Sequence, residues 1–107
     1  MVAEEAGRPQ RWRPGRPVAG AFAHGGPWAS SANPVAFAGA SADGATVPGP
    51  CGINCTNGRQ PYGFHPGGCN VLFADGSVHF LNGGLDIRVL ARLGTRAGGE
   101  VVSGADY

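Results

Sequence analysis

Apolar and polar residues alternate over two short stretches that flank an Asp-Gly pair, and this is the clearest structural pattern in the chain. The first stretch is Asn-Val-Leu-Phe-Ala (70–74) and the second is Ser-Val-His-Phe-Leu (77–81). Such alternation is typical of strands with one buried face. Asp-Gly between two strands is typical of a tight turn in which both central residues have positive φ. The pattern predicts a β-hairpin over 70–81, with Asp75-Gly76 as its two-residue turn.

A helical pattern follows the hairpin. Its apolar stripe consists of Leu85, Val89, Leu90 and Leu93. Asp86 stands where a carboxylate can accept the free backbone N–H groups of a first helical turn. Gly94 is expected to end the helix in the left-handed conformation. We therefore predict one short helix over about 86–93, with its leucines packed on the apolar face of the hairpin.

Glycine and proline dominate the rest of the chain, with 20 and 9 of the 107 residues. Pro9, Pro14 and Pro17 exclude a helix over 7–20 and predict an extended Pro/Arg-rich segment. Residues 2–6 are predicted as a strand, and a chain of this length forms one domain, 1–107. The expected fold class is α+β and β-rich: a small antiparallel sheet with a C-terminal β-hairpin (70–81), one short helix (about 86–93), long Gly/Pro-rich loops, and short strands near 21–23 and 35–38.

Bulky side chains are scarce in this composition, so we assign them to the core rather than to a surface that binds carbohydrate or peptide. The expected core residues are Trp28, Phe37, Tyr62, Phe64, Leu72, Phe73, Val78, Phe80, Leu90 and Leu93. His79 alternates with two of these residues and is expected to face solvent.

The net charge of +1 argues against a protein that binds nucleic acid, because polyanion binding needs a dense basic surface. Four arginines do gather around Trp12, at positions 8, 11, 13 and 16. Their spacing with prolines and a glycine is typical of a solvated arm. The carboxylates Asp43, Asp75, Asp86 and Asp106 stand apart, so no calcium site is predicted.

The cysteines and one histidine raise a metal hypothesis. Cys51, Cys55, His65 and Cys69 have the spacing C-x3-C-x9-H-x3-C, and its short spacings lie within the range of structural zinc sites. On this interpretation the protein is a small zinc-stabilised intracellular interaction domain.

His65 and Asp75 also raise the question of catalysis. No nucleophile stands with them in a recognisable frame, and Ser77 follows the turn directly. We therefore expect a protein that is not an enzyme and needs no cofactor. His65 is expected to be structural, packed near the turn and hydrogen-bonded to backbone or to Asp75.

The block that contains these residues also resembles a known family. His65, nine residues and then Asp75-Gly76, with Pro-Gly-Gly after the histidine, is similar to the His-x9-Asp-Gly region of prepilin-like proteins. These are secreted pseudopilin-type proteins abundant in planctomycete-type bacteria, and the region closes their C-terminal part. The corresponding hairpin region here is 64–81. Other segments that resemble the family are 2–9, 26–29, 50–57 and 90–100.

The resemblance implies secretion, in which paired cysteines form disulfides. A Cys51–Cys55 bridge is thus expected ahead of zinc, with Cys69 free and buried as a small apolar residue.

The resemblance also implies a function: a non-enzymatic structural or assembly module of the cell envelope or exterior, whose expected partners are proteins, including other pilin-like subunits. The printed sequence shows no pattern of a basic leader and no apolar stretch of about 18–20 residues, the length of a membrane helix, so we expect neither a leader nor an anchor in this portion. We expect it to be the C-terminal portion of such a protein, with no membrane contact of its own.

Overall fold

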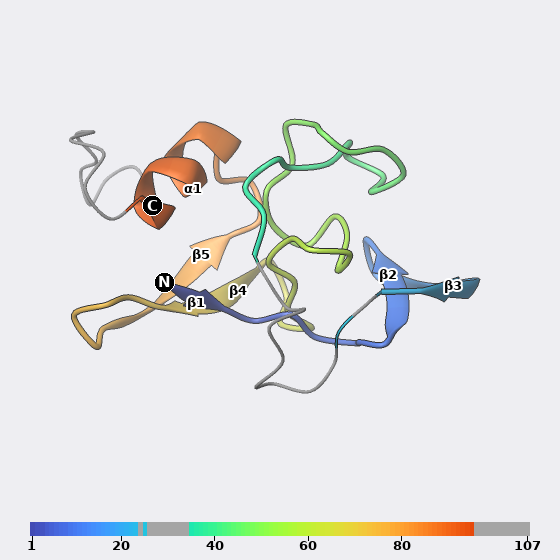
Figure 1. The fold of residues 1–107 in the computed structure, drawn as a ribbon, viewed down its shortest axis with the longest axis horizontal. Helices are drawn as coiled ribbons and strands as arrows, with labels where there is room; N and C mark the ends of the chain where they lie inside the picture. The colour runs from blue at the N-terminus through green and yellow to red at the C-terminus, as the bar shows by residue number, and fades with distance from the viewer. Residues whose placement is uncertain (24, 26–34, 96–107) are drawn as a thin grey trace.

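The computed structural model describes residues 1–23, 25 and 35–95, and these residues form two small sheets and one helix (Figure 1). The elements are β1 (Val2–Ala3), β2 (Gln10–Arg13), β3 (Arg16–Phe22), β4 (Gly68–Leu72), β5 (Val78–Asn82) and α1 (Ile87–Gly94). One sheet has the order β1-β4-β5 and the other consists of β2 and β3, with every pairing antiparallel. The expected α+β, β-rich fold class is confirmed. Within the described residues, no helix has both the length and the apolar character needed to cross a membrane.

The hairpin β4–β5 is present, but its turn is one residue longer than predicted. Leu72 pairs with Val78, and the backbone N–H of Phe73 donates to Ser77 O at 2.9 Å. The loop is therefore the three residues 74–76, and of these only Gly76 has positive φ, at 86°. This is the type I turn followed by a left-handed residue, the commonest three-residue hairpin loop. The expected two-residue turn with a left-handed Asp75 is wrong.

The register that follows from this turn decides which side chains enter the core. Because side chains alternate along a strand, a shift of one residue moves a whole set to the other face. Leu81 is buried, whereas Val78 and Phe80 are 64% and 50% exposed, and Leu72 is also exposed. His79 lies in the row of Leu81, half-buried, with its ring 5.0 Å from that of Phe73. The assignments of Leu72, Val78 and Phe80 to the core and of His79 to solvent are therefore wrong.

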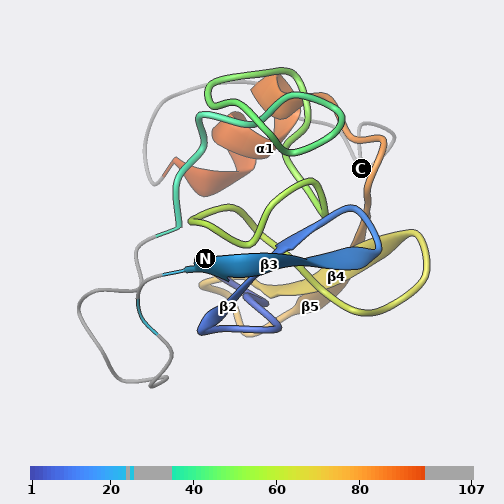
Figure 2. The ribbon, with the colours of Figure 1, turned by 90° about the vertical axis from the view of Figure 1, so that its right-hand side faces the viewer.

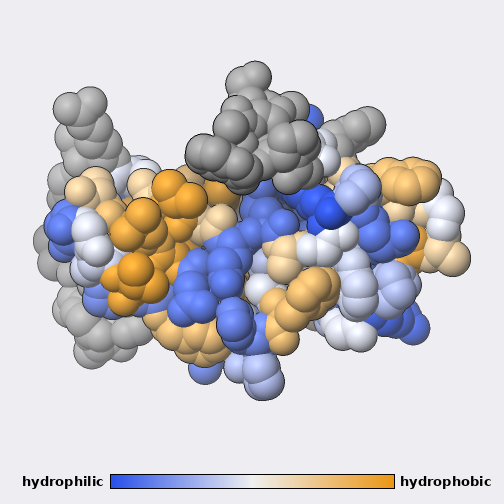
Figure 3. Space-filling view, turned by 90° about the horizontal axis from the view of Figure 1, so that it is seen from below, coloured by the Kyte–Doolittle hydropathy of each residue, from blue (hydrophilic) through white to orange (hydrophobic). Residues whose placement is uncertain are grey.

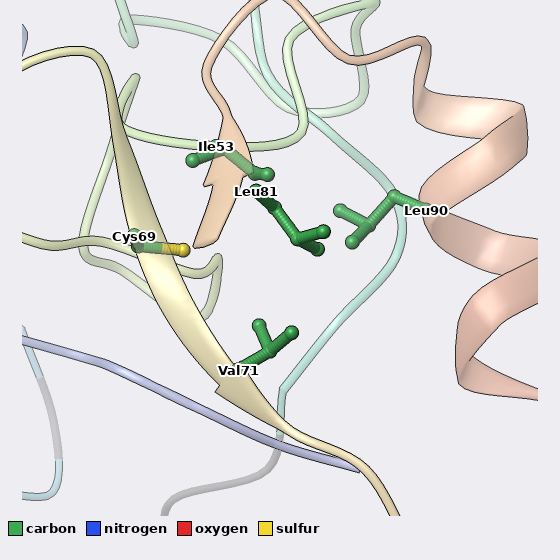
Figure 4. Packing of buried hydrophobic residues seen from close by; sticks show 5 residues of the cluster. All are labelled: Ile53, Cys69, Val71, Leu81 and Leu90. Carbon is green, nitrogen blue, oxygen red and sulfur yellow. The ribbon is translucent and has the colours of Figure 1, made fainter. Parts of the chain in front are cut away.

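The core lies between this sheet and α1. Figure 4 shows its five buried side chains converging from β4, β5, α1 and the loop before β4: Ile53, Cys69, Val71, Leu81 and Leu90. Phe37, Phe73 and Leu93 pack against this cluster and are only partly buried. Tyr62 is buried elsewhere, and Trp28 lies outside the described residues.

The helix matches its sequence prediction at the N-terminus and differs at the C-terminus. Asp86 is the N-cap, and its carboxylate accepts the backbone N–H of Arg88 at 2.7 Å. Gly94 is inside the helix and does not have positive φ. A Cβ there would overlap the ring of Phe37. Close packing, rather than a left-handed conformation, thus requires glycine at this position.

The segment over 7–20 is extended, as expected, and it folds back on itself as a second hairpin. Pro14 and Gly15 form the turn, with φ of 69° at Gly15, so that Arg13 pairs with Arg16. The side-chain amide of Gln10 donates to the backbone oxygens of Val18 at 2.7 Å and Ala21 at 3.2 Å, across a register shift between the strands. The predicted strand near 35–38 does not form.

Candidate functional site

The motif histidine lies at the open end of the β4–β5 hairpin, beside the N-terminal segment. That segment runs between two others: Glu4 N–H donates to Asn70 O at 3.2 Å, and Ala6 N–H donates to Tyr62 O at 2.8 Å. Tyr62 N–H in turn donates to Glu4 O at 2.8 Å. Backbone bonds on both sides thus fix the position of Glu4.

The Glu4 carboxylate connects three parts of the chain. Its Oε1 lies 3.1 Å from His65 Nε2, and its Oε2 accepts the backbone N–H of Asn70 at 2.7 Å. Burial raises the pKa of Glu4, but the hydrogen bonds from Asn70 and His65 outweigh burial and leave it below the usual value of 4.5. A Cβ at Gly63 would lie 2.8 Å from Oε2, so the glycine leaves room for this carboxylate.

Asp75 is bound elsewhere. Its carboxylate accepts the hydroxyl of Ser77 at 2.6 Å and the backbone N–H of Ser77 at 2.9 Å. These bonds hold the pKa of Asp75 below its usual value. The hairpin therefore separates the two polar residues of the motif: Asp75 shapes the turn, and His65 pairs with Glu4 at the opposite end. The expected placement of His65 near the turn is wrong, and its ring pairs with the Glu4 carboxylate rather than with backbone or Asp75.

Cys51 and Cys55 are joined in a disulfide, with their Cα atoms 6.2 Å apart. Within this loop Asn54 has positive φ, and its side chain accepts Gly63 N–H at 2.8 Å and donates to Gly68 O at 3.0 Å. The disulfide loop is therefore hydrogen-bonded to the residues before and after His65, Gly63 and Gly68.

The zinc interpretation is wrong for this arrangement, because the sulfurs of Cys51 and Cys55 are bonded to each other and neither is a thiolate. Among the described residues, no group of three or more His, Cys, Asp or Glu side chains could hold a metal ion. Cys69 is free and fully buried, and burial, reinforced by the charge of Glu4, raises the pKa of its thiol to about 11. A thiol in that state is a poor nucleophile.

The side chain of Asn57 holds several backbone segments together, a role that the sequence patterns do not predict. It is fully buried, its Oδ1 accepts Trp12 N–H at 2.8 Å, and its Nδ2 donates to the oxygens of Gln10 at 2.7 Å and Ala6 at 3.1 Å. As a sequence, Asn57-Gly58 is typical of a turn. Only the chemistry of its side chain suggests the role: an amide has two N–H donors and an oxygen with two lone pairs, so it can bond several backbone groups at once.

A buried ion pair supports the same junction. Arg8 Nη2 lies 3.0 Å from Glu5 Oε1 and donates to Gly58 O at 3.0 Å, while Arg8 Nε donates to Asn57 O at 3.1 Å. Burial raises the pKa of Glu5, and the charge of Arg8 opposes this effect. Arg8 thus belongs to the folded interior rather than to a solvated arm.

A groove of about 690 Å³ opens beside His65. Trp12, Tyr62 and Phe64 line it, and the turn at Pro14 lies beside the loop that leads into β4 (Figure 2). The rings of Trp12 and Phe64 meet edge to face at 4.8 Å. Phe64 is 59% exposed, so its assignment to the core is wrong.

The outer face of the three-stranded sheet is a second exposed feature. Its apolar side chains are Val2, Leu72, Val78 and Phe80, and we call this set the outer sheet face. Figure 3 shows hydrophobic side chains gathered on this side of the molecule. A shallow hollow of about 230 Å³ lies between β1, β4 and β5.

A family model described as "Protein of unknown function (DUF1559)" matches residues 1–88, from β1 through the first residues of α1. The match covers most of the chain, including the disulfide and the His65–Gly76 block. No curated protein and no solved structure matches.

Proposed function

The chain belongs to the DUF1559 family of proteins of unknown function, and from this premise we propose that it is a non-enzymatic assembly module, the C-terminal part of a pilin- or pseudopilin-like protein of the cell envelope. Its proposed partner is another pilin-like subunit, in the simplest case a second copy of this chain. The observation that carries the proposal is the outer sheet face.

Four apolar side chains on that face expose between 41% and 65% of their surfaces. Contiguous exposed apolar surface beside a sheet edge is typical of an interaction site. The strands β4 and β5 contribute no Asp, Glu, Lys or Arg to it, and the charged residue beside it is Glu4, which lines the hollow together with Val2 and Leu72. An apolar face on the partner is therefore the matching surface.

The free edge of β5 supplies the backbone groups for assembly. Hydrogen-bonded and non-hydrogen-bonded pairs alternate along an antiparallel ladder. Phe73–Ser77 and Gly67–Gly83 are hydrogen-bonded pairs, so the N–H and C=O groups of Val78 and Phe80 point away from β4. β5 is an edge strand among the described residues and has neither proline nor charge to block pairing. Two copies related by a twofold axis can pair β5 antiparallel, which brings Val78 and Phe80 of the two copies together in one continuous apolar face.

The remaining features agree with a structural role outside the cytosol. The Cys51–Cys55 disulfide fits an oxidising compartment. The polar motif residues hold backbone segments together, since Glu4, Asn57 and Asp75 each accept backbone N–H groups. This use of polar side chains supports a non-enzymatic role.

Sedimentation of the 107-residue chain across a wide concentration range tests the proposal. The parent protein should associate reversibly, and Phe80→Lys, which places a charge on the outer sheet face, should stay monomeric. Phe22→Lys is the matched control, because Phe22 is 66% exposed on β3. Circular dichroism checks that both variants fold. A parent protein that remains monomeric throughout, or equal loss of association in both variants, contradicts the proposal.

A further inference from the structure

The two polar residues of the His-x9-Asp-Gly block are exposed at opposite ends of the β4–β5 hairpin. His65 precedes β4 at the open end, and Asp75 lies in the turn between the strands. The length of the strands therefore keeps the two side chains apart within one chain. Neither residue has a part in the pairing of β5 as described so far.

Each of these side chains can form a further hydrogen bond. His65 Nε2 lies 3.1 Å from Glu4 Oε1, and the structure of the described residues gives its Nδ1 no bond. Both bonds that Asp75 accepts from Ser77 end on Oδ1, which leaves Oδ2 as an acceptor. A protonated imidazole has two N–H donors, and a carboxylate has two acceptor oxygens. His65 and Asp75 are thus chemically complementary, one as a cationic donor and the other as an anionic acceptor.

The free edge of β5 favours one register for two paired copies. The N–H and C=O groups of Val78, Phe80 and Asn82 point away from β4. An antiparallel twofold pair uses all three residues when Phe80 lies on the axis and Val78 of each copy lies opposite Asn82 of the other. We call this the full-overlap register. Any other register leaves at least one of the three residues without a partner on β5, so the full-overlap register forms the most backbone hydrogen bonds.

This register brings the open end of one hairpin beside the turn of the other. The β4–β5 register, continued toward the open end, places His65 in the row of Leu85. The full-overlap register places Asp75 of the second copy in that same row. β5 has already ended at Asn82, and the chain turns away, with Leu85 N–H donating to Asn82 O at 3.0 Å. The two motif residues are then two strand spacings apart, about 10 Å between backbones, and their side chains extend into this gap from both sides.

We propose, on the basis of the β5 pairing proposed above, that the His-x9-Asp-Gly block is a contact between two copies of this chain, in which His65 Nδ1 of each copy donates to the Asp75 carboxylate of the other. The twofold axis makes this contact occur twice in a dimer, once at each end of the paired strands. Glu4 holds the imidazole from its Nε2 side, and Ser77 holds the carboxylate at Oδ1. The second copy thus completes a block that the hairpin divides within one chain.

Sedimentation of the full chain at low ionic strength measures this contact. Asp75→Asn keeps a side-chain oxygen for Ser77 but loses the charge, and it should weaken association about tenfold, counting both contacts of a dimer. Asp43→Asn is the matched control. Asp43 is also exposed, and its carboxylate likewise accepts a serine hydroxyl and a backbone N–H, but it lies in the loop before the disulfide. This control should change association by less than about twofold.

The charge of His65 is tested through pH. A histidine gains its proton between about pH 8 and pH 5, so the parent protein should associate more tightly at pH 6 than at pH 8. Within one copy His65 faces Glu4, and Asp75 experiences the charge of His79. His65→Lys is charged at both pH values, and it should associate at pH 8 about as tightly as the parent protein does at pH 6. This variant keeps His79, so a pH effect that arises from His79 would persist in it.

His65→Gln keeps an N–H donor for Glu4 and provides a second measurement. It should weaken association at pH 6 as much as Asp75→Asn does, and circular dichroism checks that every variant folds. Phe80→Lys separates the contact from the strand pairing. If Phe80→Lys abolishes association while the variants of His65 and Asp75 behave as the parent protein does at both pH values, the contact is refuted and the β5 pairing stands. Equal weakening by Asp75→Asn and Asp43→Asn would also refute the contact.

Discussion

The Glu4 carboxylate lies 3.1 Å from the Nε2 atom of His65, which is 61 positions later in the sequence. This contact joins the segment after β1 to the open end of the β4–β5 hairpin. The same carboxylate accepts the backbone N–H of Asn70, which would otherwise lack a partner at the point where β1 ends. The motif histidine is therefore one contact of a junction whose centre is Glu4.

The first prediction concerns Glu4 and pH. Its folded pKa is below 4.5, so its charged form stabilises the fold above about pH 4.5, and this contribution is lost as the pH falls through the lower folded value. Glu4→Gln should destabilise the protein by about 1 kcal/mol at pH 7, a discounted value for a partly exposed charged hydrogen bond. Urea unfolding at pH 7 and pH 3 checks this. If the free energies of unfolding of the parent protein and of Glu4→Gln differ as much at pH 3 as at pH 7, the prediction is contradicted.

The second prediction concerns Asn57. Asn57→Ala leaves Trp12 N–H and the oxygens of Gln10 and Ala6 without their partner in the interior. Loss of several buried hydrogen bonds should destabilise the protein by about 3 kcal/mol or more. Asn82→Ala is the control, because Asn82 is exposed and its side chain accepts one backbone N–H among the described residues, that of Gly84, so its loss should remain below about 1 kcal/mol. Equal effects of the two substitutions in chemical denaturation would refute the role of Asn57.

The third prediction distinguishes a glycine required by positive φ, Gly76, from a glycine required by close packing, Gly94. Gly76→Ala should destabilise the protein by about 1 kcal/mol, because the position has φ of 86° and nothing within 4 Å of an added Cβ. In an unobstructed helix, Gly94→Ala would be stabilising by up to about 1 kcal/mol. It should instead be destabilising here, because the new methyl overlaps Phe37.

Phe37 provides the control for this comparison. In a Phe37→Leu background, Gly94→Ala should lose most of its destabilising effect, while Gly76→Ala should keep its own. A double-mutant cycle by thermal unfolding measures both. Additive effects of the two changes at positions 37 and 94 would show that contact with Phe37 is not the reason for glycine at position 94.

The fourth prediction concerns the cysteines. The denatured, unreduced protein should contain one reactive thiol, Cys69, and the reduced protein three. Paired Cys51→Ser and Cys55→Ser substitutions should destabilise the fold by about 2 kcal/mol, the chain-entropy value for a loop this short. Thiol titration in denaturant checks the first statement and urea unfolding the second. Three thiols before reduction would show that the bridge is absent.

Local signals in the sequence predicted the elements well. Alternation located both hairpin strands, and Asp86 with the leucine stripe located the helix and its buried Leu90. These features depend on neighbours within a few residues. The same holds for the strand at the N-terminus, which is shorter than expected.

Features that depend on one turn or on distant segments could not be predicted in this way. A two-residue and a three-residue loop both suit Asp75-Gly76, and the choice between them decides whether Phe80 or Leu81 enters the core. Asn57 and Glu4 contact residues 45 or more positions away, and no local pattern records such contacts. In the sequence Gln60 looks like an ordinary loop residue, and only the structure shows that it is buried.

The pairing of β1 with β4 sets an order of events for the newly made chain. Residues 2–6 emerge from the ribosome well before their partners, which lie at 62–72. Until those residues have emerged, Val2 has no strand beside it and Glu4 no amide to accept. Contacts across such separations form late, after a large loop has closed. The segment 2–6 is thus made before the hairpin but fixed in place only after it, and arrival of the hairpin is the step that closes the domain.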